Sequence, residues 1–139
     1  MRLTNLLASS LFLAAACAPD WPPNYPKLKT AKSVTIFYSV EAAQRVHPNR
    51  QLAVSKPAKL LALLDVESAE KAAVGLAPWG WLEFEMPDGK RHRCTIVKPD
   101  LLNVWDGTIL NLKTRRFSDE FNALLSAHEG RPIDVLANN

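Results

Sequence analysis

Apolar and polar residues alternate along residues 81–86 and 91–97, a pattern typical of the two arms of a β-hairpin. The arms are separated by Pro87, Asp88 and Gly89. A two-residue turn at Asp88-Gly89 would mix apolar and charged side chains on both faces of the hairpin. A three-residue loop, with Gly89 in the left-handed conformation of a bulge, keeps similar side chains together. The predicted pairs are Leu82 with Cys94, Glu83 with Arg93, Phe84 with His92, and Glu85 with Arg91.

Further strands are predicted where β-branched and aromatic residues cluster between turn signals. Residues 33–40, SVTIFYSV, contain no strand-breaking residue and predict the first strand. Residues 41–54 begin like a helix, but His47-Pro48-Asn49 interrupts them, and a short strand is expected at 51–54. A second Asp-Gly pair at 106–107 precedes the strand expected at 108–112, and residues 131–136 predict a last short strand.

Two segments predict helices with recognisable ends. The first spans 55–75, where Ser55 can cap, Pro57 suits a first turn and Gly75 ends the pattern; a break is expected near residues 65–68. The second, within 117–130, has Ser118 as the expected N-cap and Gly130 as its stop.

This order of elements predicts an α+β domain spanning residues 33–139. It consists of an antiparallel sheet of about four to five strands, with two helices packed on one face. A ferredoxin-like wiring is the alternative if the 108–112 strand is peripheral. The length of 139 residues, with 47% apolar and 22% charged residues, suits a single globular domain.

The first sixteen residues have the composition of a signal peptide. Arg2 precedes a run of small and apolar residues that is too short for a permanent membrane span. The sequence LAAAC at 13–17 resembles the lipobox of bacterial lipoproteins, although Ala14 stands where that motif favours Leu. The resemblance covers residues 1–17 and implies that Cys17 is lipidated and becomes the mature N-terminus. Cleavage by the general signal peptidase, after Ala16 or Ala18, is the alternative.

The resemblance also implies a location. Ala18 follows the cysteine in place of the Asp that retains lipoproteins in the inner membrane. The expected site is therefore the outer membrane, facing the periplasm, with the domain anchored through its N-terminal lipid. Residues 17–32 then comprise the anchor cysteine and a proline-rich tether, since the prolines there disfavour helix and strand. Without lipidation the protein would be secreted to the periplasm.

Candidate catalytic groups are few. Cys94 and His92 share one strand face, but the register places them on the core side, where a buried thiol is inert. The histidines at 47, 92 and 128 lack metal-binding spacing, and no nucleotide or hydrolase motif occurs. We therefore expect no metal, no cofactor and no catalytic residue. No dense basic block predicts nucleic-acid binding.

The stretch PWGW at 78–81 is the feature that core packing explains least. The register puts Trp81 on the solvent face with neighbouring charged residues, and Trp79 is expected to share that face. Tryptophan beside arginine is typical of interface hot spots, and aromatic platforms also stack on sugars. The alternative is that a helix or the tether covers this face. The candidate binding surface comprises Trp79, Trp81, Glu83, Glu85, Arg91 and Arg93.

These features together favour a small, lipid-anchored periplasmic binding or accessory module without catalysis, whose partner is a protein or an envelope glycan. A protein inhibitor or immunity-like factor is the second hypothesis, with the hairpin as a binding wedge. A thiol-dependent enzyme using Cys94 and His92 is the third.

Overall fold

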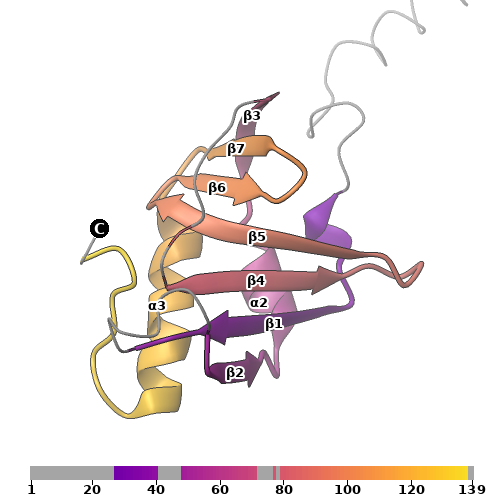
Figure 1. Cartoon of the computed structure of the whole chain (residues 1–139). Helices are drawn as coiled ribbons and strands as arrows, with labels where there is room; N and C mark the ends of the chain where they lie inside the picture. The colour runs from indigo at the N-terminus through magenta and orange to yellow at the C-terminus, as the bar shows by residue number, and fades with distance from the viewer. Residues whose placement is uncertain (1–26, 41–47, 72–76, 78, 138–139) are drawn as a thin grey trace, which may run out of the picture.

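The fold is a single antiparallel sheet with helices on one side (Figure 1). The computed structural model describes residues 27–40, 48–71, 77 and 79–137. The chain forms a 3-10 turn, seven strands and two helices in the described residues: η1 (Leu28–Thr30), β1 (Ser33–Tyr38), β2 (Arg50–Ala53), α2 (Pro57–Leu61), β3 (Val66–Lys71), β4 (Gly80–Glu85), β5 (Arg91–Lys98), β6 (Leu101–Val104), β7 (Thr108–Leu112) and α3 (Arg116–Glu129).

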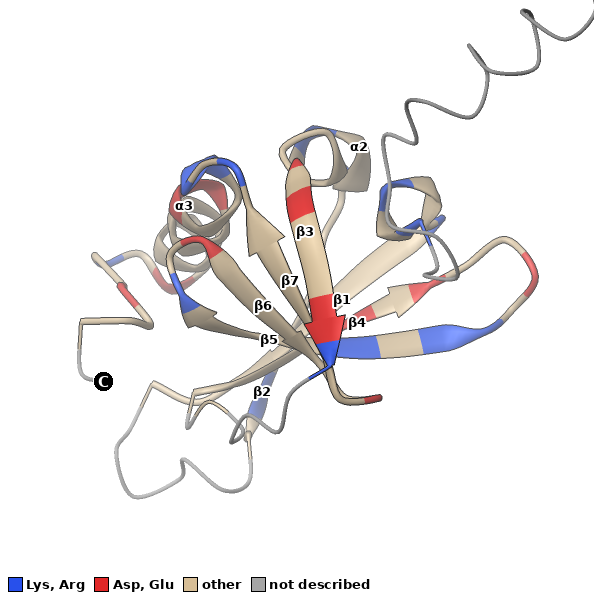
Figure 2. Ribbon diagram, turned by 90° about the horizontal axis from the view of Figure 1, so that it is seen from above, with Lys and Arg blue, Asp and Glu red and all other residues tan. Residues whose placement is uncertain are grey.

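The strands lie in the order β2-β1-β4-β5-β6-β7-β3, and every neighbouring pair is antiparallel. Figures 1 and 2 place both helices on the same side of the sheet, and α2 contacts α3. The predicted α+β class and antiparallel sheet are confirmed. The predicted four to five strands are too few, because β3 pairs at one edge of the sheet and β6 lies between β5 and β7.

The β4–β5 hairpin has the predicted register. All four predicted pairs, from Leu82↔Cys94 to Glu85↔Arg91, are Cα partners. The amide of Gly89 donates to the Met86 carbonyl at 2.9 Å, and Gly89 adopts φ 86°. Gly107, with φ 89°, makes the same bond to the Val104 carbonyl at 2.9 Å between β6 and β7. Both Asp-Gly sequences therefore form the three-residue loops that suit a left-handed glycine.

The strands predicted at 33–40, 51–54 and 108–112 are present as β1, β2 and β7, each within two residues of the expected bounds. The helix predicted over 55–75 is wrong over residues 66–71, and residues 72–75 lie outside the described part of the chain. Helix α2 ends at Leu61, and Val66–Lys71 form β3, paired with β7 at the sheet edge. The segment VESAEK has fair helix propensity, but the unpaired edge of β7 offers backbone hydrogen bonds that override it.

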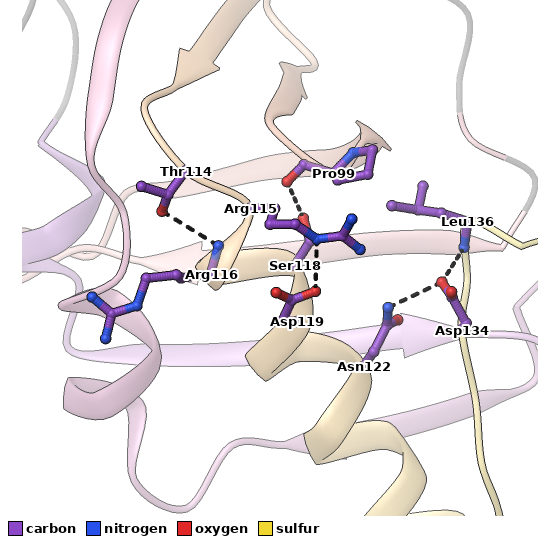
Figure 3. A network of polar contacts seen from close by, with 9 residues as sticks. All are labelled: Pro99, Thr114, Arg115, Arg116, Ser118, Asp119, Asn122, Asp134 and Leu136. Carbon is purple, nitrogen blue, oxygen red and sulfur yellow. Dashed lines mark hydrogen bonds and ion pairs between the residues drawn. The ribbon is translucent and has the colours of Figure 1, made fainter.

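The start of α3 also differs from prediction. The helix begins at Arg116, so Ser118 lies inside its first turn, and its hydroxyl donates to the Pro99 carbonyl at 2.7 Å (Figure 3). Ser118 is buried and ties the helix to the loop before β6. Gly130 ends the helix in the left-handed conformation, as predicted.

The strand predicted at 131–136 is absent from the structure. That segment runs back along α3 without pairing to the sheet, and Asn122 donates to the Asp134 carboxylate at 3.1 Å (Figure 3). The Ser126 hydroxyl accepts from the Ile133 amide at 2.8 Å. Side chains of the helix thus satisfy backbone groups that a strand partner would otherwise have taken.

The core lies between the sheet and the helices. Its largest fully buried side chains include Phe84, Phe117 and Phe121, and Leu28 ahead of β1 also belongs to it. Cys94 is fully buried there, as the hairpin register predicted.

A polar contact joins the C-terminal end of α3 to β1 and to the edge strand β2. The Glu129 carboxylate accepts from the hydroxyl of buried Tyr38 and pairs with Arg50. Burial and the bond to Glu129 raise the pKa of Tyr38 to about 12. Hydrogen bonds from Tyr38 and Arg50 lower the pKa of Glu129. The contact therefore favours a neutral tyrosine beside an ionised carboxylate.

Candidate functional site: an aromatic and arginine surface on the open face of the sheet

The sheet face away from the helices carries a cluster that we name the tryptophan–arginine face. Alternation along the strands sends Leu82 and Phe84 of β4 into the core and the side chains between them outward. The outward residues of β4 meet those of β1 and β5 and of the β6–β7 loop. The cluster consists of Phe37, Trp81, Glu83, Arg91, Arg93 and Trp105.

Arg93 is the centre of this face. Its guanidinium carbon lies 5.4 Å from the Trp81 ring centroid and 5.2 Å from that of Trp105, both within cation–π range. Trp81 and Trp105 are themselves 5.2 Å apart, with their rings tilted by 59°. On its other side, Trp81 stacks on Phe37 at 5.3 Å. The Trp81 ring is therefore covered by Phe37, Trp105 and Arg93, while Trp105 remains 39% exposed.

Glu83 fixes the two arginines. One carboxylate oxygen lies 3.1 Å from Arg93 Nε and the other 3.4 Å from an Arg91 terminal nitrogen. The Glu83 side chain is 13% exposed, whereas those of Arg91 and Arg93 are 63% and 46% exposed. Along the first half of β5, Arg91 and Arg93 alternate with uncharged residues of the core side (Figure 2). The carboxylate orients both guanidinium groups, and their outer donors remain open to solvent.

One donor within the face is unsatisfied. The indole Nε1 of Trp81 is buried and has no hydrogen-bond partner among the residues that the structure describes. A buried N–H without a partner costs about 1–3 kcal/mol. An acceptor brought by a bound partner would remove that cost.

Trp79 was predicted on this surface and is instead in the core. It is 4% exposed, packs against Phe121 at 4.9 Å and donates to the Ile96 carbonyl at 3.2 Å. The cause is Gly80, whose φ of 137° interrupts the alternation and turns the preceding side chain inward. The predicted face position of Trp79 is corrected on this ground.

Glu85 lies on the predicted side of β4, but its carboxylate contacts residues at the start of β1 and not the two arginines. Its carboxylate pairs with Lys32 at 3.2 Å and accepts from the Ser33 hydroxyl at 3.2 Å. Hydrogen bonds from Lys32 and Ser33 lower the pKa of Glu85. Arg91 therefore turns to Glu83, although its Cα partner is Glu85.

Sequence reasoning missed Phe37 and Trp105. The signal for Phe37 was its outward position in the alternating run of β1. Trp105 sits in the second Asp-Gly loop. The pairing of Cys94 with Val104 places it opposite Arg93, whose carbonyl accepts from the Trp105 amide at 3.0 Å, and no signal in the sequence indicated that pairing.

The thiol interpretation finds no supporting geometry. Burial raises the pKa of the Cys94 thiol strongly, since the thiolate would have to form in the core. His92 is only partly buried and is the cross-strand partner of Phe84. Among the described residues no three His, Cys, Asp or Glu side chains gather as metal ligands.

Several predicted features lie outside the described residues: the leader, Cys17, residues 18–26 and His47. No helix of the described ranges is long and apolar enough to cross a membrane. Comparisons of the chain with protein-family models, curated proteins and solved structures find no match.

Proposed function

We propose that this protein is a lipid-anchored periplasmic binding or accessory module that captures a protein partner with its tryptophan–arginine face. The observation that supports the proposal is Arg93, which lies against both Trp81 and Trp105 and is oriented by Glu83. Tryptophan and arginine dominate interface hot spots because they combine a large contact area with directional donors. Catalysis is no part of the proposal.

A protein partner fits this face better than a glycan does. Sugar stacking needs an open ring face, and the Trp81 ring is covered by Phe37 and Arg93. The open donors of Arg91 and Arg93 suit carboxylates or backbone carbonyls of a polypeptide. A partner carrying acidic residues around an apolar anchor is therefore the chemistry that this face would recognise.

The anchor part of the proposal rests on the sequence. The lipobox-like residues 13–17 and the prolines that follow support a domain held near the membrane and presented to the periplasm. Outer-membrane sorting follows from the same resemblance.

An inhibitor or immunity-like role is kept as the second candidate. The tip of the β4–β5 hairpin, residues 87–90, is exposed and projects beyond the neighbouring strands (Figure 1). Such a projection could enter a concave site of a target protein. The thiol-enzyme alternative gains nothing from a buried Cys94.

Intact-mass analysis of the protein from host membranes tests the anchor. A diacylglyceryl increment on Cys17, lost with membrane retention in Cys17→Ser, is expected. An unmodified mass beginning at Cys17 or Pro19 would contradict lipidation.

Site-specific photocrosslinking tests the face. A photoreactive amino acid at Trp105 should give one protease-sensitive adduct in envelopes, and the same group at exposed Ala127 of α3 should not. Arg93→Ala should abolish the adduct, whereas Arg116→Ala should preserve it, because Arg116 is an exposed arginine on another element. Adducts that resist protease and yield to glycan-degrading enzymes would favour the glycan instead.

A further inference from the structure

Lysines gather where the chain enters the folded domain. Three of them, Lys27, Lys29 and Lys32, flank or lie in η1, and Lys56 and Lys59 lie at the start of α2, which η1 contacts. A shallow groove of about 410 Å³ separates η1 from α2. Lys29 and Lys32 line it, together with the small apolar residues Ala31, Pro57, Ala58, Leu61 and Ala62. We name this surface the η1–α2 face.

The positive charge of this face is only partly compensated. Lys32 pairs with Glu85 at 3.2 Å, and Lys59 pairs with Glu120 at 3.1 Å. The side chains of Lys27, Lys29 and Lys56 make no ion pair with any described residue. Five lysines therefore meet two carboxylates, an excess of three, whereas residues 17–139 as a whole carry 16 basic and 14 acidic side chains. The remainder of the protein is close to neutral, so the charge is localised.

We infer that the η1–α2 face binds the anionic headgroups of the membrane to which the protein is tethered. This inference rests on the anchor in the proposed function. Cys17 stands ten residues before Lys27, and an extended chain of that length reaches at most about 35 Å. The anchor therefore keeps the lysines at high local concentration next to the lipid surface. Each basic side chain near anionic lipid strengthens association about fivefold.

The position of the face sets the orientation of the whole domain. Both η1 and α2 lie on the helical side of the sheet, whereas the tryptophan–arginine face lies on the opposite side. Of the five lysines, Lys32 lies at the boundary, because it pairs with the outward-facing Glu85. When the lysines contact headgroups, Trp105 and the two arginines point away from the membrane. Lipid binding thus presents the partner-binding surface to the periplasm.

Fluorescence quenching on the lipidated full chain in vesicles tests the orientation. A single label is placed at Ser55→Cys beside α2, or at Ala137→Cys in the segment that follows α3. Figure 1 shows this C-terminal segment at the far end of the domain from η1. Both positions are exposed, lipid occupies Cys17, and Cys94 is buried. With phosphatidylglycerol mixed into phosphatidylcholine, the rate constant for quenching by an aqueous quencher should fall several-fold at Ser55→Cys and stay unchanged at Ala137→Cys. Phosphatidylcholine alone, or high salt, should abolish the difference.

Matched charge variants sharpen the test. Lys27→Gln/Lys29→Gln/Lys56→Gln should weaken the electrostatic attraction about a hundredfold and abolish the protection. The control Lys71→Gln/Lys90→Gln/Lys98→Gln removes the same charge from exposed positions elsewhere and should preserve it. Protection that is equal at both labels, independent of phosphatidylglycerol, or equally sensitive to both triple variants would overturn the inference.

Intact mass of the same preparation separates the two proposals. If Cys17 carries no lipid, the anchor fails. The lysine face is then measured directly, as salt-sensitive sedimentation of the exported chain with phosphatidylglycerol vesicles. Absence of sedimentation there would overturn the lysine face as well.

Discussion

Cys94 shows how one residue's surroundings decide its chemistry. It is the partner of Leu82 in the hairpin and is completely buried, so its thiolate is disfavoured. We predict that a thiol reagent at neutral pH leaves native Cys94 unmodified and labels it on unfolding in urea. The measurement is labelling rate against urea concentration, using Cys17→Ser. Rapid labelling without urea would revive the thiol-enzyme hypothesis.

The Tyr38–Glu129–Arg50 contact predicts two pH limits to stability. The pKa of Tyr38 is raised from 10.0 to about 12. Its contribution to the free energy of unfolding is therefore complete below pH 10 and is lost as pH rises towards 12. The pKa of Glu129 is lowered from 4.5, so its contribution is complete above that pH and is lost as pH falls further.

Urea unfolding across pH measures both limits. Tyr38→Phe should lack the alkaline loss, and Glu129→Gln should be less stable than the native chain at pH 7, with the gap closing in acid. An unchanged alkaline limit in Tyr38→Phe would assign that limit to other groups.

At the scale of an element, Gly80 at the start of β4 determines how Trp79 points and how closely β1 approaches β4. A Cβ at Gly80 would lie 2.0 Å from the Phe37 carbonyl oxygen, in addition to the cost of φ 137°. Gly89 has φ 86° with no atom near its Cβ position.

We predict that Gly80→Ala destabilises the domain by about 3 kcal/mol or more, because β1 must separate from β4, whereas Gly89→Ala costs about 1–2 kcal/mol for backbone conformation alone. The free energies of unfolding of the two variants, measured side by side in urea, check this. Equal losses would show that the contact with Phe37 relaxes easily.

The elements also show what the sequence could predict. The β4–β5 register followed from matching Glu83 with Arg93 across a loop whose glycine fixed the geometry. β3 could not be foreseen, since nothing within VESAEK records that the edge of β7, some forty residues later, lacks a partner. The inward turn of Trp79 was hidden for the same reason. The φ of 137° at Gly80, which turns Trp79 inward, occurs where the Phe37 carbonyl of β1 lies against this glycine, and the local sequence does not show that contact.

At the scale of the whole molecule, the tryptophan–arginine face and the helices η1 and α2 lie on opposite sides of one sheet. The strand with the central arginine, β5, lies in the middle of the sheet order. Substitutions on one side should therefore leave the other intact, because the core between them is closed by buried residues of both layers. Partner crosslinking at Trp105 and lipid protection at Ser55 are expected to respond to separate sets of variants.

The sheet order carries a further consequence, for the route by which the chain folds. Strands β4 to β7 are consecutive neighbours joined by short loops, whereas β1 and β3 pair with strands roughly 40 residues away in sequence. Closing long loops is entropically slower than forming local hairpins. We predict that the β4–β7 meander forms the nucleus and that β1, β2 and β3 join it afterwards.

Two matched substitutions measure that order. Ile96→Val in β5 and Ile36→Val in β1 each remove one methylene from a fully buried side chain. Folding and unfolding rates in urea should show Ile96→Val mainly slowing folding and Ile36→Val mainly accelerating unfolding. The reverse would place the nucleus at β1. On the predicted route, the tryptophan–arginine face is completed only when Phe37 of β1 arrives beside Trp81, so a chain caught early in folding would present a hairpin without a finished binding surface.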